Sequence, residues 1–134
     1  ACFTDKSTQI ATLVKVIKDV DILLNCNSPK VTLGLRGQAL YFSREAIPHL
    51  RGVEKKDWLS KQTYYQHVGI YAFKHATLNA ISKLLMGVLE QSEGLEQLRW
   101  LENGYTIQTA EITSECIAVD CPEDLKRIDK KFFS

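Results

Sequence analysis

Residues 67–74, HVGIYAFK, carry a histidine and a tyrosine four positions apart. Alternate residues of a β-strand point to the same face, so His67 and Tyr71 would share a face with Gly69 between them. An imidazole and a phenol on either side of the gap left by glycine could bind an anionic or hydroxylated ligand. The alternative is a histidine that simply packs at the end of a strand, and these residues alone favour it.

A second polar group lies in the segment LEQSEGLEQLRW, residues 89–100. We expect one amphipathic helix over 88–104, with an apolar arc and an opposite polar side. The apolar arc would contain Val88, Leu95, Leu98 and Leu101, and the polar side Glu93, Glu96 and Gln97. An adjacent acid and amide suit the hydroxyls of a polyol, because Glu accepts hydrogen bonds and Gln both donates and accepts. The alternative is an ordinary solvated acidic face.

Two further side chains stand at expected strand ends. Arg44 follows the apolar run ALYFS and could bind a carboxylate with two hydrogen bonds, or form only a surface ion pair. Asp120 follows the short apolar run CIAV and precedes Pro122. A carboxylate there could bind a hard cation such as Mg²⁺, or cap the following helix. Spacing alone leaves both alternatives open.

The elements that would position these residues alternate between strands and helices. Expected strands cover 10–17, a hairpin over 30–43 turning at Arg36-Gly37, 64–73, 105–112 and 116–120. Expected helices cover a short turn after Ser43 ended by Pro48, then 75–85, 88–104 and a closing helix from Pro122. Residues 51–63 are expected to be an exposed connection, and Gly69 is expected to mark either a bulge in its strand or a close approach of another backbone. The pattern predicts an α/β fold with a mixed sheet and flanking helices.

Composition excludes several classes of protein. The 134 residues are 45% hydrophobic, which fits one small domain. Lys and Arg number 17 against 16 Asp and Glu, with no block of like charge, so neither nucleic acid nor an anionic membrane is an expected partner. No membrane span or signal peptide is evident, which favours a soluble cytoplasmic protein. The four cysteines show no metal-binding spacing and are expected to be free thiols.

Four segments in order, PKVTLGLRGQALYFSR, HVGIYAFK, LEQSEGLEQLRWLENG and VDCPEDL, resemble the C-terminal half of the 3-deoxy-manno-octulosonate cytidylyltransferase family, also called CMP-Kdo synthetases. The resemblance covers most of the chain. It implies part of a nucleotide-diphospho-sugar transferase-like, Rossmann-like fold. It also implies a transferase that joins CTP to the sugar acid Kdo, releasing pyrophosphate and giving CMP-Kdo for lipopolysaccharide synthesis, with Mg²⁺, as a cytoplasmic homodimer.

The resemblance also implies roles for individual residues. It places Arg44, His67, Tyr71, Glu96 and Gln97 around the sugar acid, and Asp120 as a Mg²⁺ ligand. Arg44 and Asp120 would be the catalytic residues among these. Catalysis in such a reaction consists mostly of positioning and of charge neutralisation.

The family's N-terminal half, with its phosphate loop and a second Mg²⁺ ligand, is not among these 134 residues. Residues 1–134 are therefore expected to be a single partial domain, the sugar-acid-binding and dimerisation half, and to be inactive alone. Two alternatives remain: a non-catalytic module that binds a sugar acid or dimerises, and a cytidylyltransferase for another acidic sugar such as a sialic acid.

Overall fold

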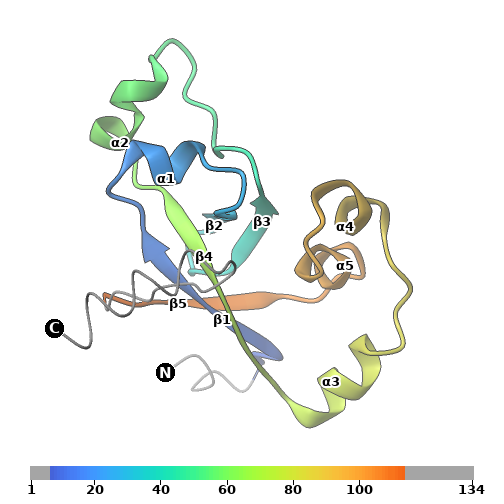
Figure 1. Ribbon diagram of the computed structural model, residues 1–134. Helices are drawn as coiled ribbons and strands as arrows, with labels where there is room; N and C mark the ends of the chain where they lie inside the picture. The colour runs from blue at the N-terminus through green and yellow to red at the C-terminus, as the bar shows by residue number, and fades with distance from the viewer. Residues whose placement is uncertain (1–6, 114–134) are drawn as a thin grey trace, which may run out of the picture.

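A computed structural model describes residues 7–113, which form a five-stranded mixed sheet surrounded by short helices (Figure 1). The strands are β1 (Ile10–Val16), β2 (Lys30–Leu33), β3 (Ala39–Ser43), β4 (Tyr65–Phe73) and β5 (Ile107–Glu111). Their order across the sheet is β3-β2-β4-β1-β5. Strand β4 is antiparallel to both of its neighbours, and β5 is parallel to β1. The expected mixed sheet with flanking helices is confirmed.

The helices are short and lie around the sheet. They are α1 (Val20–Leu24), the 3₁₀ turn η1 (Lys55–Asp57), α2 (Trp58–Lys61), α3 (His75–Ile81), α4 (Val88–Glu93) and α5 (Gln97–Glu102). Figure 1 shows α1 and α2 together near one end of the strands, whereas α4 and α5 lie side by side next to β3. No helix in the described range 7–113 is long and apolar enough to cross a membrane.

The main core joins the sheet to α3 and α5. Its fully buried members include Ile10, Val14, Val31, Phe42, Leu98 and Ile107. A second, smaller core contains Ile17, Leu23, Trp58 and Tyr64. There the indole of Trp58 stacks on the ring of Tyr64 with centroids 5.8 Å apart, and its Nε1 donates to the Val53 carbonyl at 2.9 Å. Most of the predicted exposed connection over 51–63 is exposed, but the segment contains η1 and α2, and Trp58 anchors it in an apolar core.

Strand β4 contains the bulge expected at Gly69. Thr12 of β1 lies opposite Tyr71, and the next residue, Leu13, lies opposite Val68. Gly69 and Ile70 therefore have no partners on β1. The β1–β4 ladder is interrupted between the Thr12–Tyr71 pair and the Leu13–Val68 pair. The bulge separates His67 from Tyr71 along the strand.

The predicted hairpin over 30–43 is confirmed as β2 and β3. Its turn contains Gly37 with φ of 74°, a conformation that glycine adopts without steric cost. The tip of the hairpin reaches the far edge strand β5, where the Thr109 backbone N–H donates to the Gly37 carbonyl at 3.0 Å. Both edges of the curved sheet are tied together by this contact.

The short helix predicted after Ser43 is not formed. The Ser43 hydroxyl accepts a hydrogen bond from the Glu45 backbone N–H at 3.0 Å, as a helix cap would. However, it also donates to Glu93 Oε1 at 2.7 Å, and residues 44–50 continue without a helix or strand. The prediction of a helix capped by Ser43 is therefore wrong, because its hydroxyl stabilises a local turn and bonds Glu93 instead.

The single helix predicted over 88–104 is two helices. Gly94 ends α4 in the left-handed conformation, with φ of 63°, and its N–H donates to the Glu90 carbonyl at 2.7 Å. Of the expected apolar arc, Leu95 and Leu98 are buried and Leu101 packs against the core. Val88 is 73% exposed instead, and Gln97, expected on the polar side, is buried. Helix α3 likewise ends at Ile81, so Leu85 of the predicted 75–85 helix is exposed.

Helix α1, capped by the Asp19 carboxylate, was not predicted. The predicted strand over 116–120 and the helix from Pro122 lie outside the described residues.

Candidate functional site

The imidazole of His67, on strand β4, lies in a cluster of aromatic side chains. Its ring centroid is 5.0 Å from that of Phe42, in an edge contact, and 5.3 Å from that of Tyr71. Tyr71 in turn meets Trp100 of α5 edge-on at 5.0 Å. The structure therefore brings His67 and Tyr71 together on one side of the strand despite the bulge, as the strand spacing indicated.

Burial controls the charge of both side chains. Loss of water lowers the pKa of His67 to about 4, so its imidazole is neutral at pH 7. Burial raises the pKa of the Tyr71 phenol well above its usual range, and the nearby Glu96 carboxylate raises it further. The site thus presents a neutral imidazole and a neutral hydroxyl, which bind by hydrogen bonds rather than by charge.

Glu96 and Gln97 lie where α5 begins, and the Glu96 carboxylate is near the Tyr71 phenol. Glu96 is exposed, whereas Gln97 is only 4% exposed. The Gln97 side-chain Nε2 has no hydrogen-bond partner within residues 7–113. A buried donor without a partner costs about 1–3 kcal/mol, so a ligand oxygen that reached this amide would relieve that cost.

Arg44 is held at several atoms, and four of its N–H bonds are accounted for. Its backbone N–H donates to Glu93 Oε2 at 2.9 Å and its Nε to the Glu93 carbonyl at 2.7 Å. Its Nη1 donates to the Cys26 carbonyl at 3.1 Å and its Nη2 to the Gly94 carbonyl at 3.3 Å. Within the described chain its guanidinium bonds carbonyls and no carboxylate, so it is not the surface ion pair considered as an alternative.

A guanidinium has five N–H groups, and these contacts use three of them. One N–H on each terminal nitrogen of Arg44 has no partner among residues 7–113. Two such donors on one planar group match the two oxygens of a carboxylate. The arrangement can therefore bind an anion while the rest of the side chain is fixed.

Lys30 supports Arg44 by a hydrogen bond to its backbone carbonyl. Its side chain is fully buried, and Nζ donates to the carbonyls of Asn25 and Arg44. Burial lowers the pKa of this amine, and the nearby Glu45, Cys26 and Glu93 oppose that effect. Sequence reasoning missed both Lys30 and Glu93 as supports for Arg44. The polar Lys30 within an apolar strand was the available signal for the first.

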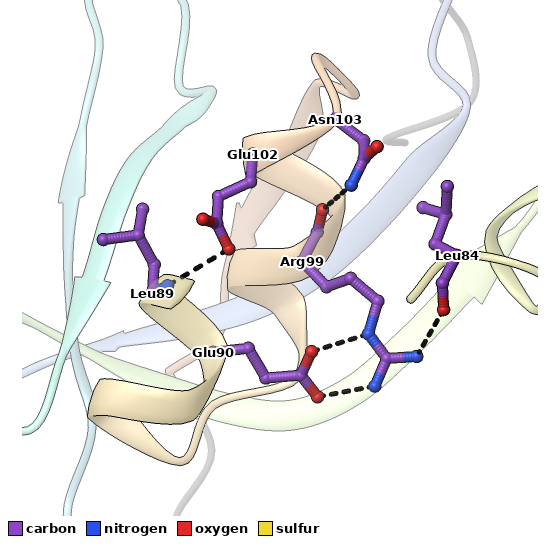
Figure 2. A network of polar contacts seen from close by, with 6 residues as sticks. All are labelled: Leu84, Leu89, Glu90, Arg99, Glu102 and Asn103. Atoms are coloured by element: carbon purple, nitrogen blue, oxygen red, sulfur yellow. Dashed lines mark hydrogen bonds and ion pairs between the residues drawn. The ribbon is translucent and has the colours of Figure 1, made fainter. Parts of the chain in front are cut away.

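A buried ion pair holds α4 and α5 together beside the site. Figure 2 shows Arg99 of α5 reaching Glu90 of α4 with two hydrogen bonds, each 2.6 Å long. The remaining terminal nitrogen of Arg99 donates to the Leu84 carbonyl at 3.2 Å, and Glu102 accepts from the Leu89 N–H at the start of α4. Hydrogen bonding to Arg99 lowers the pKa of the Glu90 carboxyl. These contacts fix the connection that carries Gly94, Glu96 and Gln97.

The structure brings predicted residues together in two places, at the α4–α5 connection and at the ring of Tyr71. Arg44 contacts Gly94, Glu96 lies near Tyr71, and Tyr71 contacts His67. Asp120 lies outside the described residues. No group of three or more His, Cys, Asp or Glu side chains within 7–113 could hold a metal ion, and Cys26 in that range is a free, exposed thiol.

Comparisons with known proteins identify the family to which the chain belongs. Residues 2–112 match the cytidylyltransferase family. The 3-deoxy-manno-octulosonate cytidylyltransferase of Phocaeicola vulgatus is 52% identical over 132 residues, which cover 96% of this chain and 52% of that protein. The one from Bacteroides thetaiotaomicron is 49% identical over 133 residues, covering 97% of this chain and 53% of that protein.

A solved structure of a CMP:2-keto-3-deoxy-manno-octonic acid synthetase complexed with CTP has the same fold. It aligns with a TM-score of 0.83 at 35% identity, covering 94% of this chain and 49% of that one. The chain thus spans about half the length of the curated relatives it matches.

Proposed function

Because the chain belongs to the cytidylyltransferase family, we propose that it supplies the sugar-acid-binding half of a 3-deoxy-manno-octulosonate cytidylyltransferase. In that reaction the anomeric hydroxyl of Kdo attacks the α-phosphorus of CTP. The bond to the β-phosphate breaks, giving CMP-Kdo and pyrophosphate. A homodimer in the cytoplasm, serving lipopolysaccharide synthesis, belongs to the same proposal.

One observation carries the assignment of this half to the sugar acid: donors without partners lie beside the α4–α5 connection. Gln97 Nε2 is buried without a partner, and Arg44 keeps one N–H on each terminal nitrogen without a partner in the described range. Kdo carries a carboxylate and several hydroxyls. Arg44 would bind the carboxylate, while Glu96, Gln97, His67 and Tyr71 would bind hydroxyls.

This chain's contribution to catalysis is to hold the sugar acid in a fixed orientation. The Arg44 side chain is held by the backbone carbonyls of Glu93, Cys26 and Gly94, so little side-chain freedom would be lost on binding. Orientation of the reacting hydroxyl converts a bimolecular encounter into a step within one complex. CTP would be held largely by the other half of the enzyme.

We include Mg²⁺ in the proposal, with Asp120 as a ligand. When bound, the metal would neutralise charge on the CTP phosphates. Within residues 7–113 no cluster of side chains fits a metal ion, so the described part of the chain does not by itself form that site.

The test joins the 134-residue chain to the N-terminal half of the Phocaeicola vulgatus relative. Pyrophosphate release from CTP is measured with Kdo and, separately, with a sialic acid. We expect turnover with Kdo, and Kdo binding by the 134-residue chain alone in calorimetry. Preference for the sialic acid would overturn the Kdo assignment. Binding of Kdo without turnover in the fused protein would favour a non-catalytic binding module.

A further inference from the structure

Thr12 of β1 forms a hydrogen bond with His67 across the sheet. The two side chains are buried, and Thr12 Oγ1 lies 2.9 Å from His67 Nε2. The same hydroxyl oxygen lies 2.8 Å from the Ile70 carbonyl oxygen and 3.3 Å from the Val68 carbonyl oxygen. Thr12 therefore has three polar neighbours at the point where β4 bulges.

The bulge explains why these carbonyls are available. Gly69 and Ile70 have no partners on β1, so the regular ladder does not provide for the carbonyl of Ile70. A buried or half-buried carbonyl without a donor costs free energy, and the nearest donor is the Thr12 hydroxyl. The Thr12 hydroxyl thus supplies the Ile70 carbonyl with the hydrogen bond that the bulged ladder does not provide.

The protons that each group carries determine which group donates in the hydrogen bonds of Thr12. A hydroxyl has one proton, and a carbonyl oxygen can only accept. If the Thr12 proton goes to the Ile70 carbonyl, the Thr12 oxygen has to accept from His67, and Nε2 has to carry a hydrogen. The imidazole is neutral, because burial lowers its pKa to about 4, so its Nδ1 then carries none.

The Nδ1 atom is also accessible. Within residues 7–113, Ser28 Oγ and Gln97 Nε2 are the only buried side-chain polar atoms without a partner. No described residue bonds His67 Nδ1, and it is not one of these two buried atoms, so it contacts solvent. The exposed part of His67 is small, at 8%. An acceptor nitrogen at the surface of an otherwise buried ring is suited to a ligand hydroxyl.

We propose that Thr12 is a positioning residue which fixes His67 as the Nε2–H tautomer, so that Nδ1 accepts a hydrogen bond from a sugar hydroxyl. The proposal rests on the proposed function for its ligand, but not for its tautomer. It also assigns His67 a chemical preference, since an acceptor nitrogen attracts a hydroxyl and repels the oxygens of a carboxylate. The carboxylate of the sugar acid is left to Arg44.

Imidazole ¹⁵N spectra test the tautomer directly in the 134-residue chain labelled with ¹⁵N-histidine. Spectra of the His49→Gln and His75→Gln variants assign the signals, since the chain has 3 histidines. At pH 7 we expect His67 to show a protonated Nε2 and an unprotonated Nδ1. A protonated Nδ1 of His67 in the unsubstituted chain would overturn the proposal whether or not the Thr12 variants fold.

Two variants of Thr12 test its part. Thr12→Val keeps the shape and removes the hydroxyl, whereas Thr12→Ser keeps the hydroxyl. We expect Val to remove the tautomer preference and to weaken Kdo binding about fivefold, the effect of losing one ordinary hydrogen bond. Ser should restore both. An unchanged tautomer in Thr12→Val would overturn the role of Thr12.

Failure of the proposed function gives a different pattern. If the unsubstituted chain shows the Nε2–H tautomer but does not bind Kdo, the tautomer assignment holds and the sugar assignment fails. If Kdo binds and the His67 Nδ1 signal does not move on binding, the hydroxyl contact is wrong. A shift of that signal on adding Kdo, absent with CTP, is the result expected.

Discussion

Glu93 holds Arg44 through both its side chain and its backbone. Glu93 Oε2 accepts from the Arg44 backbone N–H at 2.9 Å, and the Glu93 carbonyl accepts from Arg44 Nε at 2.7 Å. The second carboxylate oxygen accepts from the Ser43 hydroxyl at 2.7 Å. The end of β3 is thereby tied to the end of α4, and these bonds hold the Arg44 side chain in one orientation.

We expect Glu93→Gln to weaken Kdo binding while sparing CTP binding. Both carboxylate oxygens face donors, so an amide NH₂ placed there opposes one of them. Losing one hydrogen bond to a charged acceptor predicts about tenfold weaker Kdo binding. Calorimetry with Kdo measures this, and Glu54→Gln, at an exposed ion pair, is the control. Equal losses for Kdo and CTP in the fused enzyme would point to general misfolding instead.

Gly94 supplies the turn between α4 and α5, and its substitution has a matched control in Gly104. Both glycines have positive φ, 63° and 82°, so alanine at either position should cost about 1 kcal/mol in free energy of unfolding. Only Gly94 contributes a carbonyl to Arg44. We therefore expect similar losses of stability in denaturant unfolding, but weaker Kdo binding only for Gly94→Ala. Equal Kdo affinities in the two variants would contradict this role of the turn.

The sequence predicted those features that depend on local pattern. Strand-type composition identified β1 and β4, alternation identified the β2–β3 hairpin and β5, and Gly69 lies at the bulge. The same reasoning missed the break at Gly94, because apolar spacing continues through it and hides two short helices. It also treated Glu93 as a solvated residue, although Glu93 bonds Ser43 and Arg44 from 50 and 49 positions away. Such contacts depend on tertiary structure, which periodicity does not record.

The buried amide of Gln97 predicts a trade between stability and binding. Its Nε2 makes no hydrogen bond within the described chain, so a methionine of similar length should remove a cost rather than a contact. We expect Gln97→Met to raise the melting temperature and to weaken Kdo binding about tenfold. Gln91→Met, on an exposed position of α4, controls for added hydrophobicity. A lower melting temperature for Gln97→Met alone would show that the amide has a partner in the free protein.

Burial of neutral His67 makes stability depend on pH in a predictable direction. Its pKa is lowered from 6.5 to about 4 in the folded chain, so between these values the unfolded chain binds the proton and the folded chain does not. The contribution of neutral His67 to the free energy of unfolding is therefore fully present above pH 6.5 and is lost as the pH falls toward 4. At about 1.36 kcal/mol for each pKa unit, the loss reaches about 3 kcal/mol.

His67→Gln cannot titrate, so the difference in unfolding free energy between it and the unsubstituted chain should fall by that amount between pH 7 and pH 4. Urea unfolding at several pH values measures the difference, and parallel curves for the two proteins would show that His67 is not buried as a neutral ring.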